Sequence, residues 1–264
     1  MYKNGQELLD LCAKEHKRAW EVALDAETKL TGMTREKLWA SFEMRLDVMI
    51  GSATKALEHK QATKGSLVDG VANCQYQYSQ KDGSVTGNYM NYIMALAYSS
   101  SEVNASMGKI CASPTAGSCG ILPAVLVGMM NKEGYPREKV VEALIYASAV
   151  GAIYTRNATV AGADDQSCFN AAGFAMINVM GLVCDPVAGL VALPCAQRNA
   201  SGAVNAMIAA DMALAGQVSH IPFDEVVEAM FKVGKMLPPQ LRETAKGGIA
   251  TTPAGKAINK AVFG

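Results

Sequence analysis

The chain has 264 residues, of which 50% are hydrophobic and 18% are charged, and its formal net charge is zero. This length allows one large domain or two small ones around a sizeable core. The balanced charge, without any block of like charges, argues against nucleic-acid binding, which needs a basic face. No segment resembles a secretory signal or reaches the roughly 18 apolar residues of a membrane span, so we expect a cytoplasmic protein without a membrane role.

Two helices are expected in the first part of the chain. Apolar residues recur at helical spacing over residues 6–30. A second run begins after Thr34, a typical N-cap residue, and continues to about residue 60. Its apolar stripe consists of Leu38, Phe42, Leu46, Met49 and Ile50. We interpret residues 1–60 as an N-terminal helical layer, followed by polar loops at 62–70 and 79–87.

From residue 88 onward the chain is rich in Ala, Gly, Met and Ser and poor in charge. The predicted helices cover about residues 88–107, 120–132, 137–156, 168–181, 200–215 and 223–235. Aromatic residues make up only 6% of the chain, and strand-like alternation is scarce. We therefore predict an all-α protein with a compact multi-helix core over residues 88–264, so that one domain spans 1–264.

Four links between these helices are rich in Gly, Pro, Ser and Thr. They cover residues 109–123, 157–168, 181–202 and 241–256. A loop that enters a core must satisfy its backbone N–H and C=O groups, and such loops often bind ligands. We therefore expect the four links to converge on one site, the alternative being ordinary helix connections.

The sequence "SPTAGSCG" (113–120) precedes one of the predicted helices. It supplies the hydroxyl groups of Ser113, Thr115 and Ser118, and a turn from Gly117 to Gly120 that exposes backbone N–H groups. Free N–H donors at the start of a helix suit an anion such as a carboxylate. The alternative is simple N-capping of the helix by Ser or Thr.

The segment "GLVCDPVAGLVALPCAQRNASG" (181–202) holds Cys184 and Cys195 in an apolar run that Pro186 and Pro194 interrupt. We expect no single regular helix or strand to span it. No CxxC pair is present, which excludes a zinc-ribbon or zinc-finger pattern. The spacing suits thiolates that hold a metal cluster from separate loops. A zinc site and two buried thiols are the alternatives.

Five blocks of the chain carry a resemblance to a known family. They are "SEVNASMGKICASPTAGSCGILPAVL" (101–126), "NVMGLVCDPVAGLV" (178–191), "PCAQRNASGAVNAMIAADMALAG" (194–216), "IPFDEVVEAM" (221–230) and "LRETAKGGIATTP" (241–253). In this order they resemble the α chain of the iron–sulfur-dependent L-serine dehydratases (L-serine ammonia-lyases). The blocks span most of residues 101–253, and the N-terminal helices fit more loosely.

The resemblance implies an all-α catalytic core that converts L-serine to pyruvate and ammonia. It implies a [4Fe–4S] cluster whose open iron assists the β-elimination of water, as a Lewis-acidic metal does elsewhere. Cys184 and Cys195 would be cluster ligands. The implied substrate contacts are Ser113, Thr115, Gly117, Ser118, Arg198 and Asn199. The base that removes the α-proton is not identified.

The resemblance also implies a partner. Two-chain members of the family have a smaller β chain with a Ser/His-rich motif near the active site, and this sequence has no such motif. We therefore expect a serine dehydratase β subunit, a hetero-oligomer, and an active site completed across their interface. The reaction would serve serine degradation and gluconeogenesis.

One part of the chain departs from the family pattern. The family's first cluster cysteine lies in a "GGCQAE"-like loop after "NATVAGA" (157–163), but here "DDQSCFNAAGF" (164–174) follows at once. About twenty-five family positions have no counterpart. Either the deletion is real, and Cys168, Cys119 or Cys111 must substitute, or the sequence omits a stretch. We favour omission, because both joined ends match the family and a helix is hard to delete from a packed core.

Three other functions stay open. The same chemistry could act on another β-substituted amino acid, such as threonine or cysteine. A real deletion would favour a cluster-free binding or regulatory subunit. Pyridoxal-phosphate catalysis through a lysine Schiff base also deaminates serine, but no lysine lies in a suitable setting, and we disfavour it.

Overall fold

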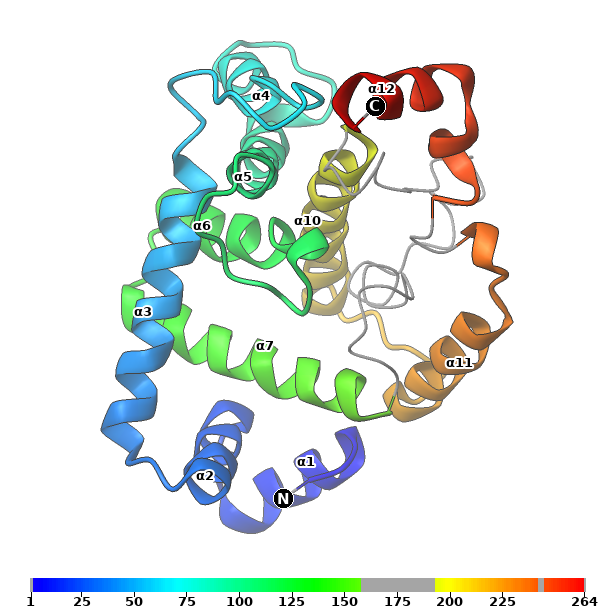
Figure 1. The fold of residues 1–264 in the computed structure, drawn as a ribbon. Coiled ribbons are helices and arrows are strands. Elements are labelled where there is room, and N and C mark those ends of the chain that lie inside the picture. The colour runs from blue at the N-terminus through cyan, green and yellow to red at the C-terminus, as the bar shows by residue number, and fades with distance from the viewer. Residues whose placement is uncertain (1, 158–192, 242–244, 264) are drawn as a thin grey trace.

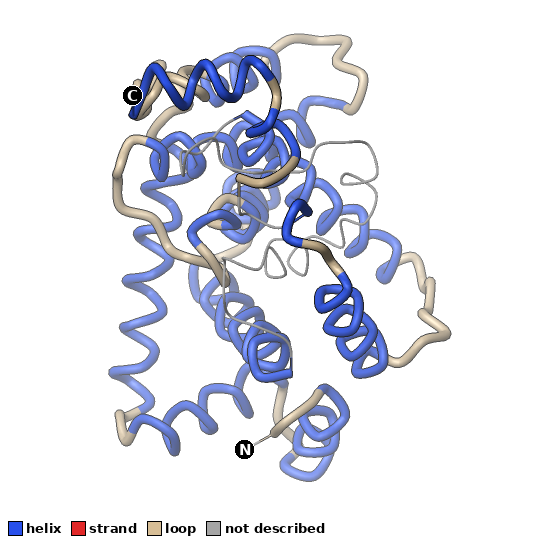
Figure 2. The backbone as a smooth tube through the Cα atoms, turned by 45° about the vertical axis from the view of Figure 1, so that its right-hand side comes forward, coloured by secondary structure: helices blue, strands red, loops and turns tan. Residues whose placement is uncertain are grey.

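The computed structural model describes residues 2–157, 193–241 and 245–263. Every regular element in these ranges is a helix, so the all-α prediction is confirmed (Figures 1 and 2). The α-helices are α1 (Gly5–Glu15), α2 (Ala19–Thr31), α3 (Arg35–Thr54), α4 (Val71–Ser79), α5 (Gly87–Ala105), α6 (Ile121–Glu133), α7 (Arg137–Asn157), α10 (Leu193–Leu214), α11 (Phe223–Met236) and α12 (Pro253–Phe263). Short 3₁₀ helices are η1 (Ala116–Ser118), η3 (Pro239–Leu241) and η4 (Gly248–Thr251).

The N-terminal helices differ in number from the prediction. The expected single run over residues 6–30 is two helices, because His16 adopts a left-handed conformation that ends α1. Thr34 caps α3 as predicted, since its side-chain oxygen accepts a hydrogen bond from the Lys37 N–H at 3.4 Å. The helix ends at Thr54, earlier than expected.

One cluster of buried side chains joins the N-terminal helices to α7. It contains the predicted α3 stripe, of which Leu46 is fully buried. Its other buried members are Tyr2, Leu8, Val22, Ala23, Leu24, Leu126, Val140, Val141, Leu144, Ile145, Ala149 and Ile153. We call this set the N-terminal cluster.

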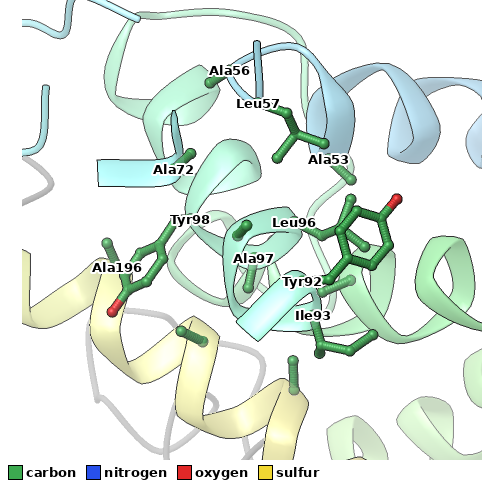
Figure 3. Close-up of a cluster of buried hydrophobic side chains, with 14 of the residues drawn as sticks. Ala53, Ala56, Leu57, Ala72, Tyr92, Ile93, Leu96, Ala97, Tyr98 and Ala196 are labelled. Atoms are coloured by element: carbon green, nitrogen blue, oxygen red, sulfur yellow. The ribbon is translucent and has the colours of Figure 1, made fainter. Parts of the chain in front are cut away.

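A second cluster surrounds α5, which lies between α3 and α10 (Figure 1). Small residues of α10 at helical spacing, Ala196, Ala200 and Ala203, are each at most 2% exposed and pack in this cluster. Figure 3 shows Ala196 beside Tyr98 of α5. Because these side chains are small, the two helices can approach closely. We call this set the central cluster.

The two clusters share α3 and α6. The division into an N-terminal layer (1–60) and a core (88–264) therefore stays a prediction. No helix in the described ranges is long and apolar enough to cross a membrane.

Polar bonds inside the core fix α5 against α3. The Ser99 hydroxyl donates to the Ser52 carbonyl oxygen at 2.7 Å and accepts from the Ala56 N–H at 3.0 Å. Ser99 is fully buried. Its hydroxyl thus satisfies a backbone donor and a carbonyl where water has no access.

The sequence did not predict α4, which lies between the two expected loops. Its N-cap residue, Gly70, is left-handed and offers no side chain. Instead the buried carboxylate of Glu102, on α5, accepts from the Ala72 N–H at 2.6 Å. A side chain of α5, thirty positions further along the chain, therefore caps the start of α4.

Candidate functional site

The segment 113–120 forms a turn between α5 and α6, around η1. Its hydroxyl groups bond to one another and to its own backbone. The Ser118 hydroxyl donates to the Ser113 carbonyl oxygen at 2.8 Å and accepts from the Thr115 N–H at 3.3 Å. Ser118 is only 2% exposed, whereas Gly117 is exposed. These bonds fix the conformation of the turn and cap η1, whereas the N-cap residue of α6 is Gly120, which has no side chain, so the expected capping of α6 by Ser or Thr is not found.

Asn199, on α10, fastens this turn to the second half of the chain. Its Oδ1 accepts from the Gly120 N–H at 2.8 Å. Its Nδ2 donates to the Gly117 carbonyl oxygen at 2.7 Å and to the Cys195 carbonyl oxygen at 3.0 Å. The residue is 2% exposed. One carboxamide thus joins both ends of the glycine turn to the first turn of α10.

Asn104, on α5, holds the same turn from the other side. Its Nδ2 donates to the Ala116 carbonyl oxygen at 2.9 Å. The carbonyls of two consecutive residues, Ala116 and Gly117, are therefore bonded by amide side chains from two different helices. Sequence reasoning gave Asn104 no role, because a single exposed-looking asparagine in a helix carries no local signal.

Gly120 has no room for a side chain. A Cβ atom there would lie 2.5 Å from the Ala97 carbonyl oxygen and 3.0 Å from the Asn199 Cβ. Real Cβ atoms essentially never come as close as 2.5 Å to a backbone oxygen. Glycine at this position lets the turn lie directly against α5 and α10.

The start of α10 corrects one expectation about the segment 181–202. Residues from Leu193 onward are helical, so Cys195, Arg198 and Asn199 lie on a helix and not in a bent link. Pro194 is compatible with this, because the first turn of a helix leaves its N–H groups without partners in the helix. The proline interrupts the sequence pattern but begins the helix.

The structure therefore unites part of the predicted site. Ser113, Thr115, Gly117 and Ser118 share one turn, and Asn199 connects that turn to Cys195. Arg198, next to Asn199, is 8% exposed and places a buried guanidinium at this end of α10. Cys184 and the link 157–168 lie outside the described residues, apart from Asn157.

The described residues do not by themselves fit a cluster that needs three thiolates. Within them, no three Cys, His, Asp or Glu side chains lie where they could share a metal ion. Cys119 is 1% exposed, and its thiol donates to the Ser100 carbonyl oxygen at 3.7 Å. Cys111 packs against the N-terminal cluster, and burial raises the pKa of its thiol. We therefore derive no chemical step through a cluster.

Glu102 is the most perturbed carboxyl group near the turn, two residues before Asn104. The side chain is fully buried, and its Oε2 has no hydrogen-bond partner. Burial raises the pKa of Glu102 from its ordinary value of 4.5 to about 7, against the effect of the backbone N–H groups of Ala72, Gly70 and Val71. This carboxyl group can hold a proton near neutral pH.

Together, the fold and the turn define an all-helical protein with a hydroxyl-rich glycine turn fixed beside a cysteine-bearing helix. The family model described as "Serine dehydratase alpha chain" matches residues 14–165 and 158–250. The chain belongs to this family.

Relatives named as α chains match it almost from end to end. The "L-serine dehydratase, alpha chain" of Peptoniphilus asaccharolyticus is 39% identical over 98% of both chains. The "Probable L-serine dehydratase, alpha chain" of Bacillus subtilis (strain 168) is 38% identical over 100% of this chain and 96% of the relative. The "L-serine dehydratase" of Helicobacter pylori (strain J99 / ATCC 700824) is 27% identical over 95% of this chain, but only 62% of that relative is covered.

The same comparisons show an internal length difference. The alignment with the Peptoniphilus protein is 285 positions long and includes 98% of the 264 residues, which leaves about 26 positions without a counterpart here. The Bacillus alignment, 290 positions over the whole chain, leaves about the same number. The two family matches meet at residues 158–165, where the sequence analysis expects the missing stretch.

Proposed function

We propose that this chain is the α subunit of an L-serine ammonia-lyase, which converts L-serine to pyruvate and ammonia. The observation that carries the proposal is the attachment of the 113–120 turn to the first turn of α10 through Asn199. This attachment joins two sequence blocks that are 79 residues apart at Gly120 and Asn199. Near full-length similarity to relatives named as L-serine dehydratase α chains supports it.

In this proposal the turn binds the substrate carboxylate. The Gly117 N–H and the hydroxyls of Ser113 and Thr115 supply donors, and Gly117 allows close approach of the substrate to the backbone. Ser118, whose hydroxyl donates to the Ser113 carbonyl oxygen, fixes the turn from inside. The buried guanidinium of Arg198 adds positive charge, and a charge-assisted bond to a carboxylate is roughly twice as strong as a neutral one. Binding and orientation of L-serine are thus the tasks of these residues.

The reaction itself is balanced without an oxidant or reductant. The α-proton and the β-hydroxyl group leave L-serine as water, and the resulting enamine takes up water and releases ammonia to give pyruvate. We propose Cys184 and Cys195 as ligands of an iron–sulfur group. Cys195 lies in the first turn of α10, and its carbonyl oxygen accepts from the same Asn199 side chain that holds the turn, which is compatible with this role.

A β subunit is part of the proposal. This chain covers almost all of the relatives that are named as α chains. The Helicobacter relative, whose name mentions no separate chain, has more than a third of its length outside the match. A second chain would supply that missing part. We propose a hetero-oligomer in the cytoplasm.

The test is anaerobic purification of the chain with its co-expressed β subunit, followed by iron and sulfide analysis and by a pyruvate assay with L-serine. About four irons per α chain, with pyruvate release, would support the proposal. Turnover of L-cysteine, measured as pyruvate, and of L-threonine, measured as 2-oxobutanoate, decides the substrate preference. The variants Ser113→Ala and Thr115→Ala should raise KM, with Ser41→Ala on α3 as the hydroxyl control.

A second candidate is a cluster-free binding or regulatory subunit. The missing positions favour it, and within the described residues no three Cys, His, Asp or Glu side chains could share a metal ion. A chain with the calculated mass of 27.8 kDa that binds L-serine in calorimetry, contains no iron and forms no pyruvate would establish this function instead.

A further inference from the structure

We propose that Asn104 and Asn199 are positioning residues that together set the conformation of the 113–120 turn for binding the substrate carboxylate. We call them the asparagine pair. The inference rests on the proposed function, but it assigns these two residues a role different from direct substrate contact.

The Asn199 side chain makes all of its hydrogen bonds inside the protein. Its Oδ1 accepts from Gly120, and its Nδ2 donates both to Gly117 and to Cys195. A carboxamide nitrogen carries two hydrogens, so both donors are used. At 2% exposure the residue acts on a ligand through the turn that it holds.

The asparagine pair bonds two carbonyl groups that follow one another in the chain. Asn104 bonds the Ala116 carbonyl oxygen from α5, and Asn199 bonds the Gly117 carbonyl oxygen from α10. Each peptide unit is planar, so fixing the Ala116 carbonyl oxygen also fixes the direction of the Gly117 N–H. The Gly117 carbonyl oxygen shares its unit with the Ser118 N–H, which donates to the Thr115 carbonyl oxygen at 3.3 Å. A preorganised turn binds a ligand with less loss of conformational entropy.

The turn packs tightly against α5 and α10. Gly120 lies so close to Ala97 and Asn199 that a Cβ atom would not fit. The Ser118 hydroxyl closes the turn from inside, through Ser113 and Thr115. The asparagine pair thus holds the turn in a fixed position relative to α5 and α10.

The test uses the isosteric variants Asn199→Asp and Asn104→Asp. Aspartate keeps the shape of asparagine but replaces the donating Nδ2 by an oxygen. This oxygen cannot donate, so the hydrogen bond to the carbonyl oxygen of the turn is lost. The matched control is Asn91→Asp at the other end of α5. Asn91 is 3% exposed and donates to the Gly87 carbonyl oxygen at 2.8 Å, far from the turn in sequence.

Three measurements are made on the α chain in complex with its β subunit. They are hydrogen–deuterium exchange of peptides that cover 113–120, KM and kcat for L-serine, and the calorimetric affinity for L-serine. We expect Asn199→Asp to speed hydrogen–deuterium exchange in the turn and to raise KM for L-serine about tenfold, with a smaller change in kcat. Asn104→Asp should change exchange and KM in the same direction. Asn91→Asp should leave exchange of the turn and KM unchanged.

The inference is overturned if exchange of the turn and serine affinity are unchanged in both pair variants, or if the control variant changes them equally. A wild-type complex that forms no pyruvate from L-serine would refute the proposed reaction and not the pair. In that case exchange of the turn and calorimetric binding of L-serine still decide the positioning role.

Discussion

The carboxylate of Asp224, in the first turn of α11, accepts a hydrogen bond from the Gly5 N–H at 2.7 Å, across 219 positions of the chain. Its second oxygen accepts from the Gln6 N–H at 3.0 Å. These N–H groups begin α1 and have no acceptor within that helix. The ring of Phe223 lies against the same place, since a Cβ on Gly5 would come within 2.7 Å of it. The start of α1 is therefore docked on the start of α11.

This docking predicts that Asp224→Ala lowers the free energy of unfolding by about 1–2 kcal/mol, because it removes two acceptors from a helix N-terminus. Urea denaturation measures the change. Glu225→Ala, which removes a carboxylate of the same charge from the same helix turn, should have a clearly smaller effect. Equal effects would mean that the charge of the α11 N-terminus matters and the contact with α1 does not.

A second prediction compares Gly120, the residue before α6, with Gly151 in α7. Gly120→Ala places a Cβ 2.5 Å from the Ala97 carbonyl oxygen, so α6 must shift away from α5. We expect a loss of about 1–3 kcal/mol in the free energy of unfolding. Gly151→Ala in α7 meets no atom within 4 Å and should stabilise the protein by about 0.5–1 kcal/mol. Thermal unfolding of the two variants should shift in opposite directions, and a shared direction would contradict the packing described for Gly120.

The helices that the sequence predicted well are those with long apolar periodicity. Helices α3, α5, α6, α7 and α11 contain enough turns for the apolar spacing to be clear, and Thr34 marks the start of α3. The short helix α4 has only two buried residues, and its start is capped by Glu102, thirty positions away. A tertiary contact of this kind leaves no local signal.

The sequence predicted a turn over 113–120, but not how the turn is held. From composition it indicated exposed donors, whereas the structure bonds most N–H groups of the turn within the protein. The bonds of Asn199 to Gly117 and Gly120 join parts of the chain about eighty positions apart, which residue spacing cannot reveal. The predicted start of α10 was wrong, because Pro194 lies in the first turn of the helix, where a proline resembles an interruption of the sequence pattern.

A third prediction tests the buried serines between α5 and α3. Ser99→Ala removes the acceptor of the Ala56 N–H and should cost about 1–3 kcal/mol of stability, because a buried donor is left without a partner. Ser101→Ala is the matched control. The Ser101 hydroxyl, 1% exposed, donates to the Ala97 carbonyl oxygen in its own helix, so its removal leaves no N–H group unsatisfied. Chemical denaturation that showed the same loss for both variants would refute the assigned role of Ser99.

A fourth prediction concerns the pH dependence of stability and Glu102. Below pH 4.5 the carboxyl group is protonated in both the folded and the unfolded chain, so it does not change the free energy of unfolding with pH. Between pH 4.5 and about 7 the unfolded chain releases this proton and the folded chain keeps it. Rising pH therefore favours unfolding in this window, and the effect becomes constant above pH 7.

The Glu102→Gln variant keeps the shape of the side chain and an oxygen that can accept from the Ala72 N–H, but it has no proton to release. Across the window from pH 4.5 to about 7, the stability of the wild type relative to Glu102→Gln should fall by an amount on the order of 3 kcal/mol. Urea denaturation of both proteins at several pH values measures this difference. Glu138→Gln, at an exposed position of α7, controls for the loss of one charge. Parallel pH profiles for the wild type and Glu102→Gln would mean that the buried carboxyl group ionises in the folded chain as it does in the unfolded one.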